Sequence, residues 1–387
     1  MTDKKVTHVA TSAVRAGIDT DSQFGAVVPP IYLTSTYSFA GFDEKREFDY
    51  SRSGNPTRNM LGQALAELEQ GAHGVVTACG TAGCHLATML LDANDLLVIP
   101  HDCYGGTYRL FTNLAAKGHF ELAIVDQHDE QALTEVLARR PKMVWVETPS
   151  NPLMRLVDIA AISDKAHTVD ALVVVDNTFM SPALQQPLTL GADLVLHSTT
   201  KFINGHSDVV GGCLIAKDPE IGEQIAWWSN CIGVTGAPFD SYLTLRGIRT
   251  LLPRVRQHEE NAQKIVELLV AHPKVSKVHY PGLTDHPSHE LAKRQQHGFG
   301  GMIAFELDAD IEQVKAFLDE LILFCLAESL GGVESLVAHP ATMTHAAMDE
   351  DARLAAGITD NLLRLSVGIE HVDDLIADLN AALSVLE

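Results

Sequence analysis

The sequence predicts an α/β protein in which a mostly parallel sheet of seven strands is joined to a smaller α+β domain in the C-terminal part. Short apolar runs alternate with helix-like stretches from about residue 60 to residue 255. After Pro253 this alternation is replaced by one long helix-like stretch and a few widely spaced apolar runs. Hydrophobic residues make up 46% of the 387 residues, which is enough for an extensive core.

Seven apolar runs are the predicted strands of the main sheet. They cover residues 74–78, 96–99, 122–125, 143–146, 172–175, 194–196 and 213–216. A strand that is apolar at nearly every position is typical of a parallel sheet, because helices cover both of its faces. A helix-like stretch at 57–70 precedes the first run, and helical stretches separate most of the others.

The chain is predicted to have three parts. Residues 1–60 are rich in turn formers and read as an extended arm, of a kind that often packs on a neighbouring subunit. Residues 61–255 form the α/β domain, and residues 256–387 form the α+β domain. Within the last part a helix at 254–270 precedes strands at 275–280, 302–307 and 363–367.

The charge balance argues against nucleic acid or an anionic membrane as the main partner. The chain has 28 Lys+Arg and 50 Asp+Glu residues, a formal charge of -22, whereas both partners require a basic surface. Six scattered cysteines form no C-x-x-C pair and no H-E-x-x-H pattern occurs, so neither a disulfide framework nor a metal site is expected. No apolar stretch resembles a signal peptide or a membrane span, which predicts a cytoplasmic protein.

Two chemically active side chains follow predicted strands of the main sheet. Asp176 directly follows one apolar run, and Lys201 follows the next run and a hydroxyl segment at 198–200. Open α/β sheets place ligands at the carboxyl ends of such strands. An amine that forms an imine, hydroxyls for a phosphate and a carboxylate for a ring nitrogen are the groups that pyridoxal 5'-phosphate requires. The alternative is an exposed loop lysine beside a turn-capping aspartate, and the combination of groups favours the cofactor.

A glycine-containing turn at 79–83 is a further candidate for phosphate binding. It follows the first predicted strand and opens a helix-like stretch, so backbone N–H groups of Gly80 and Thr81 would face an anion. Ser198 and Thr200 would add hydroxyl donors. The turn is neither a Walker loop nor G-x-G-x-x-G, which disfavours a nucleotide-binding enzyme. Alternatively, the small residues only allow the helix to pack closely.

Tyr104 and Arg364 are candidates to contact the cofactor and the substrate. Tyr104 follows the run at 96–99 and either stacks on a cofactor ring or is an ordinary loop tyrosine. Arg364 lies inside an apolar run, where a buried arginine requires a partner. That partner is either the α-carboxylate of a substrate or an internal Asp or Glu.

Several segments resemble the γ-family of fold-type I pyridoxal-phosphate enzymes of Cys/Met metabolism. They are YSRSGNPT at 50–57, DNT at 176–178, STTKFINGHSD at 198–208, AESLGG at 327–332 and the segment around Arg364. The resemblance extends over essentially the whole chain. It implies a fold-type I transferase fold, pyridoxal 5'-phosphate as cofactor and small amino-acid substrates. It also implies a homotetramer built as a dimer of dimers that share active sites.

The resemblance also implies a reaction. The chain is similar to members that join an O-acylhomoserine, with O-succinyl-L-homoserine expected, and L-cysteine to give L-cystathionine in methionine biosynthesis and transsulfuration. The alternative is a γ-lyase that cleaves L-cystathionine with the same residues. Ser53 stands where some synthases have a second arginine, which leaves the acyl group open, and Gly106 replaces the cysteine of methionine γ-lyases. A cofactor-bearing protein without turnover is disfavoured because every catalytic position is intact.

Individual residue roles follow from the same resemblance. The predicted cofactor-binding residues are Tyr50, Arg52, Gly80, Thr81, Tyr104, Asp176, Ser198, Thr200 and Lys201. The predicted substrate-binding residues are Arg109, Glu328, Ser329 and Arg364. Lys201 would bond covalently to the cofactor and serve as the base, with Tyr104 and Tyr50 assisting. Tyr50 and Arg52 would reach, from the arm, the cofactor phosphate of the neighbouring subunit.

Overall fold

The computed structural model describes residues 8–346 and 350–386 and divides into two compact units. Unit 1 comprises Met1–Asp92 and Leu172–Leu252, and unit 2 comprises Ala93–Ala171 and Pro253–Glu387. The predicted limits of the arm and of the two domains, near residues 60 and 255, remain a prediction.

Seven strands form the main sheet, which confirms the predicted α/β architecture. In unit 1 they are β1 (His73–Thr77), β5 (Leu172–Asp176), β6 (Leu194–His197) and β7 (Gly212–Ala216). In unit 2 they are β2 (Leu96–Pro100), β3 (Glu121–Val125) and β4 (Met143–Glu147). The order is β1-β7-β6-β5-β4-β2-β3, and β7 runs antiparallel to both of its neighbours. The pairs β5–β6, β2–β3 and β2–β4 are parallel, so the carboxyl ends of β5 and β6 lie together.

A second sheet of five strands lies in unit 2. Its strands are β8 (Val275–His279), β9 (Met302–Leu307), β10 (Cys325–Leu326), β11 (Leu336–Ala338) and β12 (Leu362–Ser366), in the order β10-β11-β12-β9-β8. The three strands predicted here are confirmed to within a residue or two. Strands β10 and β11 went unpredicted. Strand β10 has two residues, at the end of the apolar run 321–326, and β11 has three.

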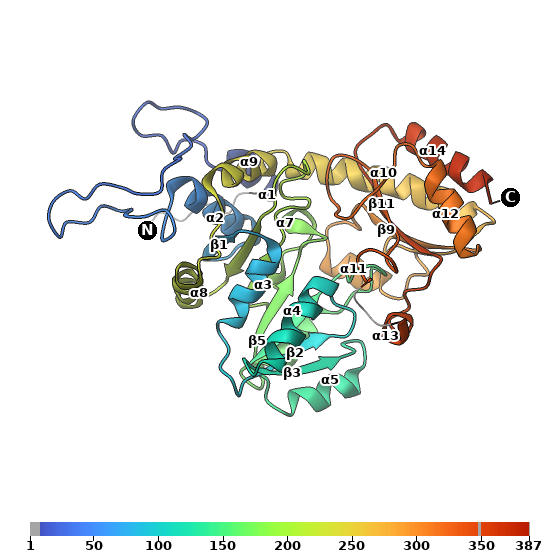
Figure 1. Ribbon diagram of the computed structural model, residues 1–387, viewed down its shortest axis with the longest axis horizontal. Helices are drawn as coiled ribbons and strands as arrows, with labels where there is room; N and C mark the ends of the chain where they lie inside the picture. The colour runs from blue at the N-terminus through green and yellow to red at the C-terminus, as the bar shows by residue number, and fades with distance from the viewer. Residues whose placement is uncertain (1–7, 347–349, 387) are drawn as a thin grey trace. The chain divides into compact units, whose positions relative to one another are not determined.

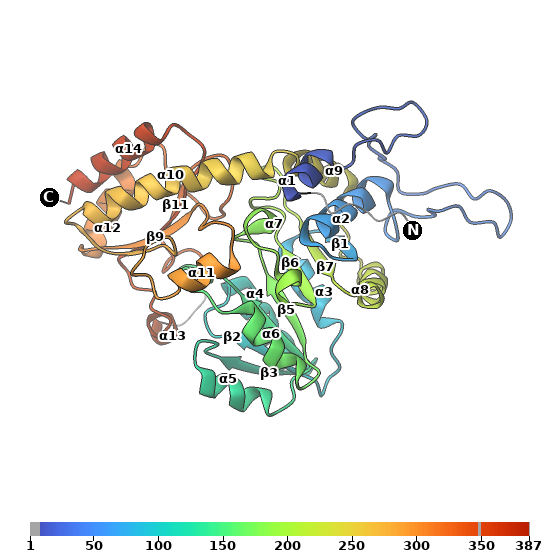
Figure 2. The ribbon, with the colours of Figure 1, turned by 180° about the vertical axis from the view of Figure 1, so that it is seen from behind.

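The core of this second sheet is formed with three helices. Residues of α10 (Leu251–Ala271), α12 (Ile311–Glu320) and α14 (Val372–Ser384) share one buried apolar cluster with β9 and β12. Phe305 and Phe317 are fully buried in it. Figures 1 and 2 show these helices beside the strands. The other helices of unit 2 are α4 (Gly105–Ala116), α5 (Glu130–Leu137), α6 (Ile159–His167), α11 (His289–Gln295) and α13 (Glu350–Ala355).

The helices of unit 1 surround its four strands. They are α1 (Val9–Arg15), α2 (Pro56–Glu69), α3 (Gly80–Thr88), α7 (Ser181–Leu184), the 3-10 turn η1 (Pro187–Leu190), α8 (Pro219–Ile232) and α9 (Pro238–Ile248). Helix α2 shows why a helix starts where the sequence predicts one. The side chain of Asn55 accepts hydrogen bonds from the N–H groups of Thr57 and Arg58, and Pro56 occupies the first helical position.

Between α1 and α2 the chain forms an arm with little regular structure. Its only described β-type contacts are isolated bridges, Thr36 with Tyr50 and Gly41 with Glu44. Large apolar side chains on it, including Phe24 and Phe42, are exposed. Figure 1 draws this arm, in dark blue, as long loops that leave the rest of unit 1. In residues 8–346 and 350–386 no helix is both long and apolar enough to cross a membrane.

Candidate active site

The start of α3 forms the predicted anion-binding turn in unit 1. Cys79 caps the helix, since its Sγ accepts the N–H of Ala82 at 3.3 Å. A Cβ added at Gly80 would lie 2.8 Å from Cβ of Ser198, so the turn and the Ser198 segment are in direct contact and only glycine fits. Within the described residues the N–H groups of Gly80 and Thr81 have no partner in the protein, and they stand at the positive end of the helix.

Thr178 ties the carboxyl ends of β5 and β6 together. Its N–H donates to Oδ1 of Asp176 at 3.0 Å, and its Oγ1 accepts the N–H of Ser198 at 2.9 Å. Burial raises the pKa of Asp176, while hydrogen bonds from Thr178 and the charge of His197 act in the opposite direction. The structure therefore places the predicted Asp176 and Ser198 on adjacent strand ends. Thr178 was missed by the sequence analysis, although its position two residues after Asp176 suits an Asx turn.

Lys201 lies in the turn that follows Ser198. The N–H of Lys201 donates to the carbonyl of Ser198 at 3.2 Å, and the carbonyl of Lys201 accepts from Gly205 at 2.8 Å. The neighbouring Thr200 is held by Gly211, whose N–H donates to Oγ1 at 3.0 Å. Unit 1 thus combines backbone N–H groups, two hydroxyls, a half-buried carboxylate and a primary amine. These groups fit a phosphorylated aldehyde with a ring nitrogen.

Tyr50 and Arg52 lie on the arm and make no hydrogen bond to the residues described above. The guanidinium of Arg52 stands 5.5 Å from the ring centre of Tyr50, and its Nε donates to Oδ1 of Asn230 at 3.0 Å. Both side chains are exposed. No hydrogen bond in the described chain joins either of them to Gly80 or Ser198.

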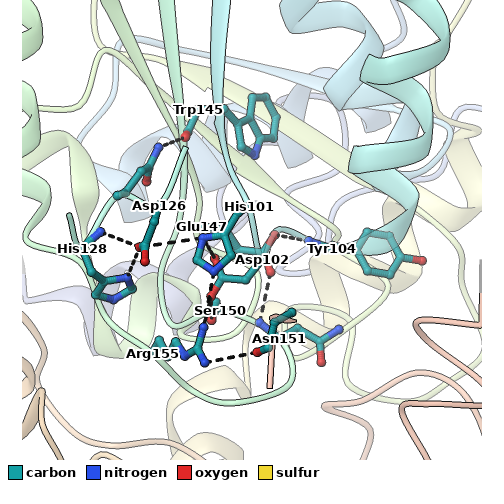
Figure 3. Close-up of polar contacts among 12 residues, drawn as sticks. His101, Asp102, Tyr104, Asp126, His128, Trp145, Glu147, Ser150, Asn151 and Arg155 are labelled. Atoms are coloured by element: carbon teal, nitrogen blue, oxygen red, sulfur yellow. Dashed lines mark hydrogen bonds and ion pairs between the residues drawn. The ribbon is translucent and has the colours of Figure 1, made fainter. Parts of the chain in front are cut away.

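Tyr104 is held at the start of α4 in unit 2. Its N–H donates to Oε2 of Glu147 at 2.8 Å, and Oε1 of Glu147 accepts the N–H of Asn151 at 3.3 Å. Figure 3 shows Tyr104 with its backbone tied to Glu147 and its ring turned away from that network. A Cβ at Gly106 would lie 2.4 Å from Cε1 of Tyr104, so the ring lies against the glycine. Glycine at 106 therefore leaves room for this aromatic side chain.

Arg364 is buried in β12 with neutral partners. Its Nη1 donates to Oδ1 of Asn151 and its Nη2 to the carbonyl of Ser329, both at 2.8 Å. Its Nε is buried without a hydrogen-bond partner among the described residues. Ser329 has a φ of 99°, a strained conformation for a residue with a side chain. The internal Asp or Glu considered for Arg364 forms no ion pair with it in the described part of the chain.

Charged neighbours set the electrostatics around Arg364. Burial lowers the pKa of Arg364 to about 10, and the negative charge of Glu328 opposes this shift. Burial also lowers the pKa of His345 to about 4, with a further contribution from the charge of Arg364. His345 is thus neutral at pH 7. Of the predicted substrate residues, Glu328 and Arg109 are exposed, and Arg109 makes no side-chain hydrogen bond or ion pair within the described residues.

Glu147, Asn151 and His345 are polar residues that the sequence analysis missed. Glu147 ends β4 as Asp176 ends β5, so the strand-end rule applied to Asp176 would also have selected Glu147. Asn151 and His345 carried no such signal, because the hydrogen bond of Asn151 to Arg364 and the electrostatic effect of Arg364 on His345 join distant parts of the sequence. In the described residues no cluster of His, Cys, Asp or Glu is arranged to hold a metal ion.

The sequence and the structure of the chain are similar to those of known enzymes. Residues 10–384 match the family described as Cys/Met metabolism PLP-dependent enzyme. The chain is 60% identical over 371 residues to cystathionine gamma-synthase of Escherichia coli (strain K12), with 96% of each chain covered. A crystal structure of cystathionine gamma synthase from Xanthomonas oryzae pv. oryzae, in complex with aminoacrylate and cysteine, has a TM-score of 0.97 at 59% identity and 98% coverage of both chains. Cystathionine gamma-lyase from Lactobacillus plantarum, complexed with L-serine, has a TM-score of 0.94 at 41% identity and covers 98% of this chain and 99% of its own.

Proposed function

Because the chain belongs to the Cys/Met metabolism PLP-dependent enzyme family, we propose that it joins an O-acyl-L-homoserine and L-cysteine. The products are L-cystathionine and the free acid, and O-succinyl-L-homoserine is the expected donor. The observation that carries this proposal is the strand-end set in unit 1. Asp176, Ser198 and Lys201 stand at the ends of β5 and β6, beside the first turn of α3.

The residues of this set suit distinct parts of the cofactor. The N–H groups of Gly80 and Thr81 and the hydroxyls of Ser198 and Thr200 bind its phosphate. Asp176 would bind the protonated ring nitrogen, and Tyr104 would stack on the ring. When bound, pyridoxal phosphate supplies an electron-accepting ring that stabilises the charge left when a proton leaves the substrate.

Lys201 performs the proton transfers. Its amine would hold the cofactor and, with the substrate bound, would take the proton from Cα. Once that proton has been passed on to the cofactor, the same flexible side chain would take a proton from Cβ, and the acyloxy group would leave Cγ with its bonding electrons. The cysteine thiolate then forms the new bond at Cγ, and Lys201 returns protons to the carbon atoms. Tyr104 and Tyr50 assist these transfers.

Arg364 and Ser329 bind the α-carboxylate of the substrate. The supporting observation is that Arg364 is buried with only neutral partners, so an anion would compensate its charge. Arg109 is the candidate for the distal carboxylate of a succinyl group, because it is exposed and unpaired within the described residues. Glu328, which acts electrostatically on Arg364, contributes to substrate binding.

Cleavage of L-cystathionine by γ-elimination is the second candidate. It requires the same base, cofactor contacts and carboxylate site, and a lyase of this type has a similar fold. Sequence identity favours the synthase, at 60% against 41% for the γ-lyase structure. Either activity predicts loss of turnover in Lys201→Ala.

The arm supports a shared active site in a dimer, paired into a homotetramer. Phe24, Leu33 and Phe42 are large apolar side chains that the arm exposes in one chain, which is typical of a subunit contact. Mixing Lys201→Ala with Arg52→Ala subunits tests this directly. If Arg52 acts in the neighbouring site, random mixed dimers recover about a quarter of the wild-type sites, since one site per mixed dimer is intact. If Arg52 acts within its own chain, no activity returns.

The reaction itself is tested with purified protein and three substrates. O-succinylhomoserine, O-acetylhomoserine and cystathionine are compared, each with and without cysteine. Cysteine-dependent formation of cystathionine from one ester establishes the synthase and identifies its donor. Release of a keto acid and cysteine from cystathionine, with little use of the esters, would assign the γ-lyase instead. Turnover by Lys201→Ala would refute the proposed base.

A further inference from the structure

An open cleft of about 990 Å³ lies in unit 2, and none of the residues assigned above to the cofactor or the substrate lines it. His101, which directly follows β2, and Asp126, which directly follows β3, are part of its lining. The two strands are parallel neighbours, with Pro100 opposite Val125. Open α/β sheets place ligands at the carboxyl ends of such strands, and small-molecule pockets measure roughly 300–1,000 Å³. The position and the size of the cleft therefore suit a second small ligand.

Two cations of the cleft keep hydrogen-bond donors that the protein does not use. Nη2 of Arg155 donates to a backbone carbonyl at 3.1 Å, but Nη1 lies 3.5 Å from Nε2 of His101 and 3.7 Å from Oδ2 of Asp102. Lys277, on β8, is exposed and makes no hydrogen bond or ion pair within the described residues. Burial lowers the pKa of His279, and the charges of Lys277 and Arg155 act in the same direction, so both cations lie near this ring.

His286 adds a neutral donor to the same cleft. Burial lowers its pKa to about 4, so the ring is neutral at pH 7. Nδ1 accepts the N–H of Ser288 at 3.1 Å, which leaves the ring proton on Nε2. Nε2 has no hydrogen-bond partner in the part of the chain that the structure describes. Together with Arg155 and Lys277, this N–H group suits a carboxylate, which accepts several hydrogen bonds.

Carboxylates also line the cleft, which disfavours a ligand that is only an anion. They are Asp126, Asp285 and Glu306. Oε1 of Glu306 is 2.8 Å from Nε2 of His279, whereas Asp285 is exposed and makes no hydrogen bond or ion pair within the described residues. Oδ1 of Asp126 accepts the N–H of His128 at 2.9 Å, and Oδ2 has no partner there. Asp126 and Asp285 are therefore available to an ammonium group.

Apolar side chains form a third part of the lining, among them Leu153, Val278 and Leu283. The cleft thus offers donors for a carboxylate, acceptors for an ammonium group and apolar surface for a side chain. An α-amino acid with an apolar side chain carries all three complementary groups.

A short turn connects the cleft to Arg364. The N–H of Ser150 donates to the carbonyl of Arg155 at 2.9 Å, and its Oγ donates to Oδ2 of Asp102 at 2.8 Å (Figure 3). The next residue, Asn151, accepts a hydrogen bond from Nη1 of Arg364. A ligand that draws the guanidinium of Arg155 toward itself therefore acts on the turn that positions Arg364.

We propose that the cleft binds a free α-amino acid with an apolar side chain, and that its occupancy changes the affinity of the enzyme for its substrate. The carboxylate of this ligand contacts Arg155, Lys277 and His286, and its ammonium group contacts Asp126 and Asp285. Binding in the cleft is independent of the proposed reaction. Only the effect on the substrate rests on the proposed function, through the role of Arg364.

Isothermal titration calorimetry of the holoenzyme tests the site with L-leucine, L-methionine and L-phenylalanine. We expect at least one of them to bind. Its deaminated acid and its decarboxylated amine should bind at least about tenfold more weakly, since each lacks one charged group and the hydrogen bonds of that group. The visible absorbance of the cofactor is recorded in parallel, because an amino acid that reacts with the cofactor changes that band, whereas binding in the cleft does not.

The variant Lys277→Gln/Asp285→Asn removes one cation and one carboxylate from the cleft and changes only exposed side chains. Its affinity for the amino acid should fall at least about tenfold, with kcat/KM unchanged when no amino acid is added. The matched control Glu312→Gln/Lys315→Gln makes the same charge changes on α12, outside the cleft, and should bind like the wild type. Absence of binding by all three amino acids, equal binding of an analogue, or equal affinity of the two variants would overturn the proposal.

The effect on the substrate is tested by measuring KM with and without the amino acid that binds. We expect a change of at least about fivefold in the wild type and none in Lys277→Gln/Asp285→Asn. Ser150→Ala removes the hydrogen bond to Asp102 and should bind the amino acid normally while the change in KM becomes smaller. An unchanged KM in the wild type at saturating amino acid would refute the regulatory part. If no homoserine ester and no cystathionine is turned over, the proposed function and the regulatory part fail together, whereas calorimetry still decides whether the cleft binds amino acids.

Discussion

Oδ1 of Asn151 lies 2.8 Å from Nη1 of Arg364, and these residues are 213 positions apart in the chain. This hydrogen bond gives the buried guanidinium of Arg364 a neutral partner. No ion pair within the described residues compensates the positive charge of Arg364. Such an arginine can bind the carboxylate of a substrate without first breaking an internal salt bridge.

Arg364→Lys is expected to raise the KM for the amino-acid substrates. Lysine keeps the charge but cannot form the paired hydrogen bonds of a guanidinium. Hydrogen bonds to charged groups contribute about 1.5–3 kcal/mol, so kcat/KM should fall roughly 10- to 100-fold in steady-state assays. Asn151→Asp is the companion variant, because an internal carboxylate would compete with the substrate for Arg364. An unchanged KM in Asn151→Asp would show that Arg364 does not bind the substrate carboxylate.

Gly106→Ala is expected to displace the ring of Tyr104. The added methyl would lie 2.4 Å from Cε1 of that ring, far inside van der Waals contact. We expect weaker cofactor binding and a shifted visible absorbance band of the bound cofactor. A double-mutant cycle with Tyr104→Ala supplies the control, since the methyl group should have no effect once the ring is gone. Purely additive effects of the two changes would contradict this explanation.

Glu147→Gln is expected to loosen both Tyr104 and Asn151. One carboxylate accepts their two N–H groups, and the amide retains only a single accepting oxygen. The loss should be about 1–3 kcal/mol in the free energy of unfolding, accompanied by a change in the cofactor absorbance band. The matched control is Glu121→Gln, which changes an exposed carboxylate on β3. Equal effects of the two substitutions would rule out a specific role for Glu147.

The protein is expected to lose stability as the pH falls below neutral. Burial lowers the pKa of His258 and of His345 from 6.5 to about 4, so the unfolded chain binds more protons than the folded chain between these values. This contribution to stability is complete above about pH 6.5 and is lost progressively toward pH 4. Urea unfolding at several pH values measures it. His258→Gln should flatten the pH dependence, whereas the exposed His371→Gln should not.

The positions of most strands along the chain could be predicted from the sequence, because the apolar run that marks a strand is a local pattern. The runs at 143–146 and 302–307 became β4 and β9 to within a residue, since burial on both faces requires apolar side chains throughout each strand. Asp176 and Lys201 were also found locally, each just after such a run. The strands β10 and β11 escaped prediction because each has only two or three residues and is defined by its pairing, β10 with β11 and β11 with β12.

By itself, the sequence determined the fold class, the family and the reactive residues that follow predicted strands. Apolar periodicity and motifs can be recognised within short stretches of the chain. Only the tertiary structure decided which residues lie next to each buried ionisable side chain. Arg364 has a neutral amide partner rather than an internal carboxylate, and Glu69 meets His197 across 128 positions. The physical reason is that burial makes the free energy of a charge depend on its few nearest neighbours. Chain folding brings those neighbours together from distant positions that no local pattern connects.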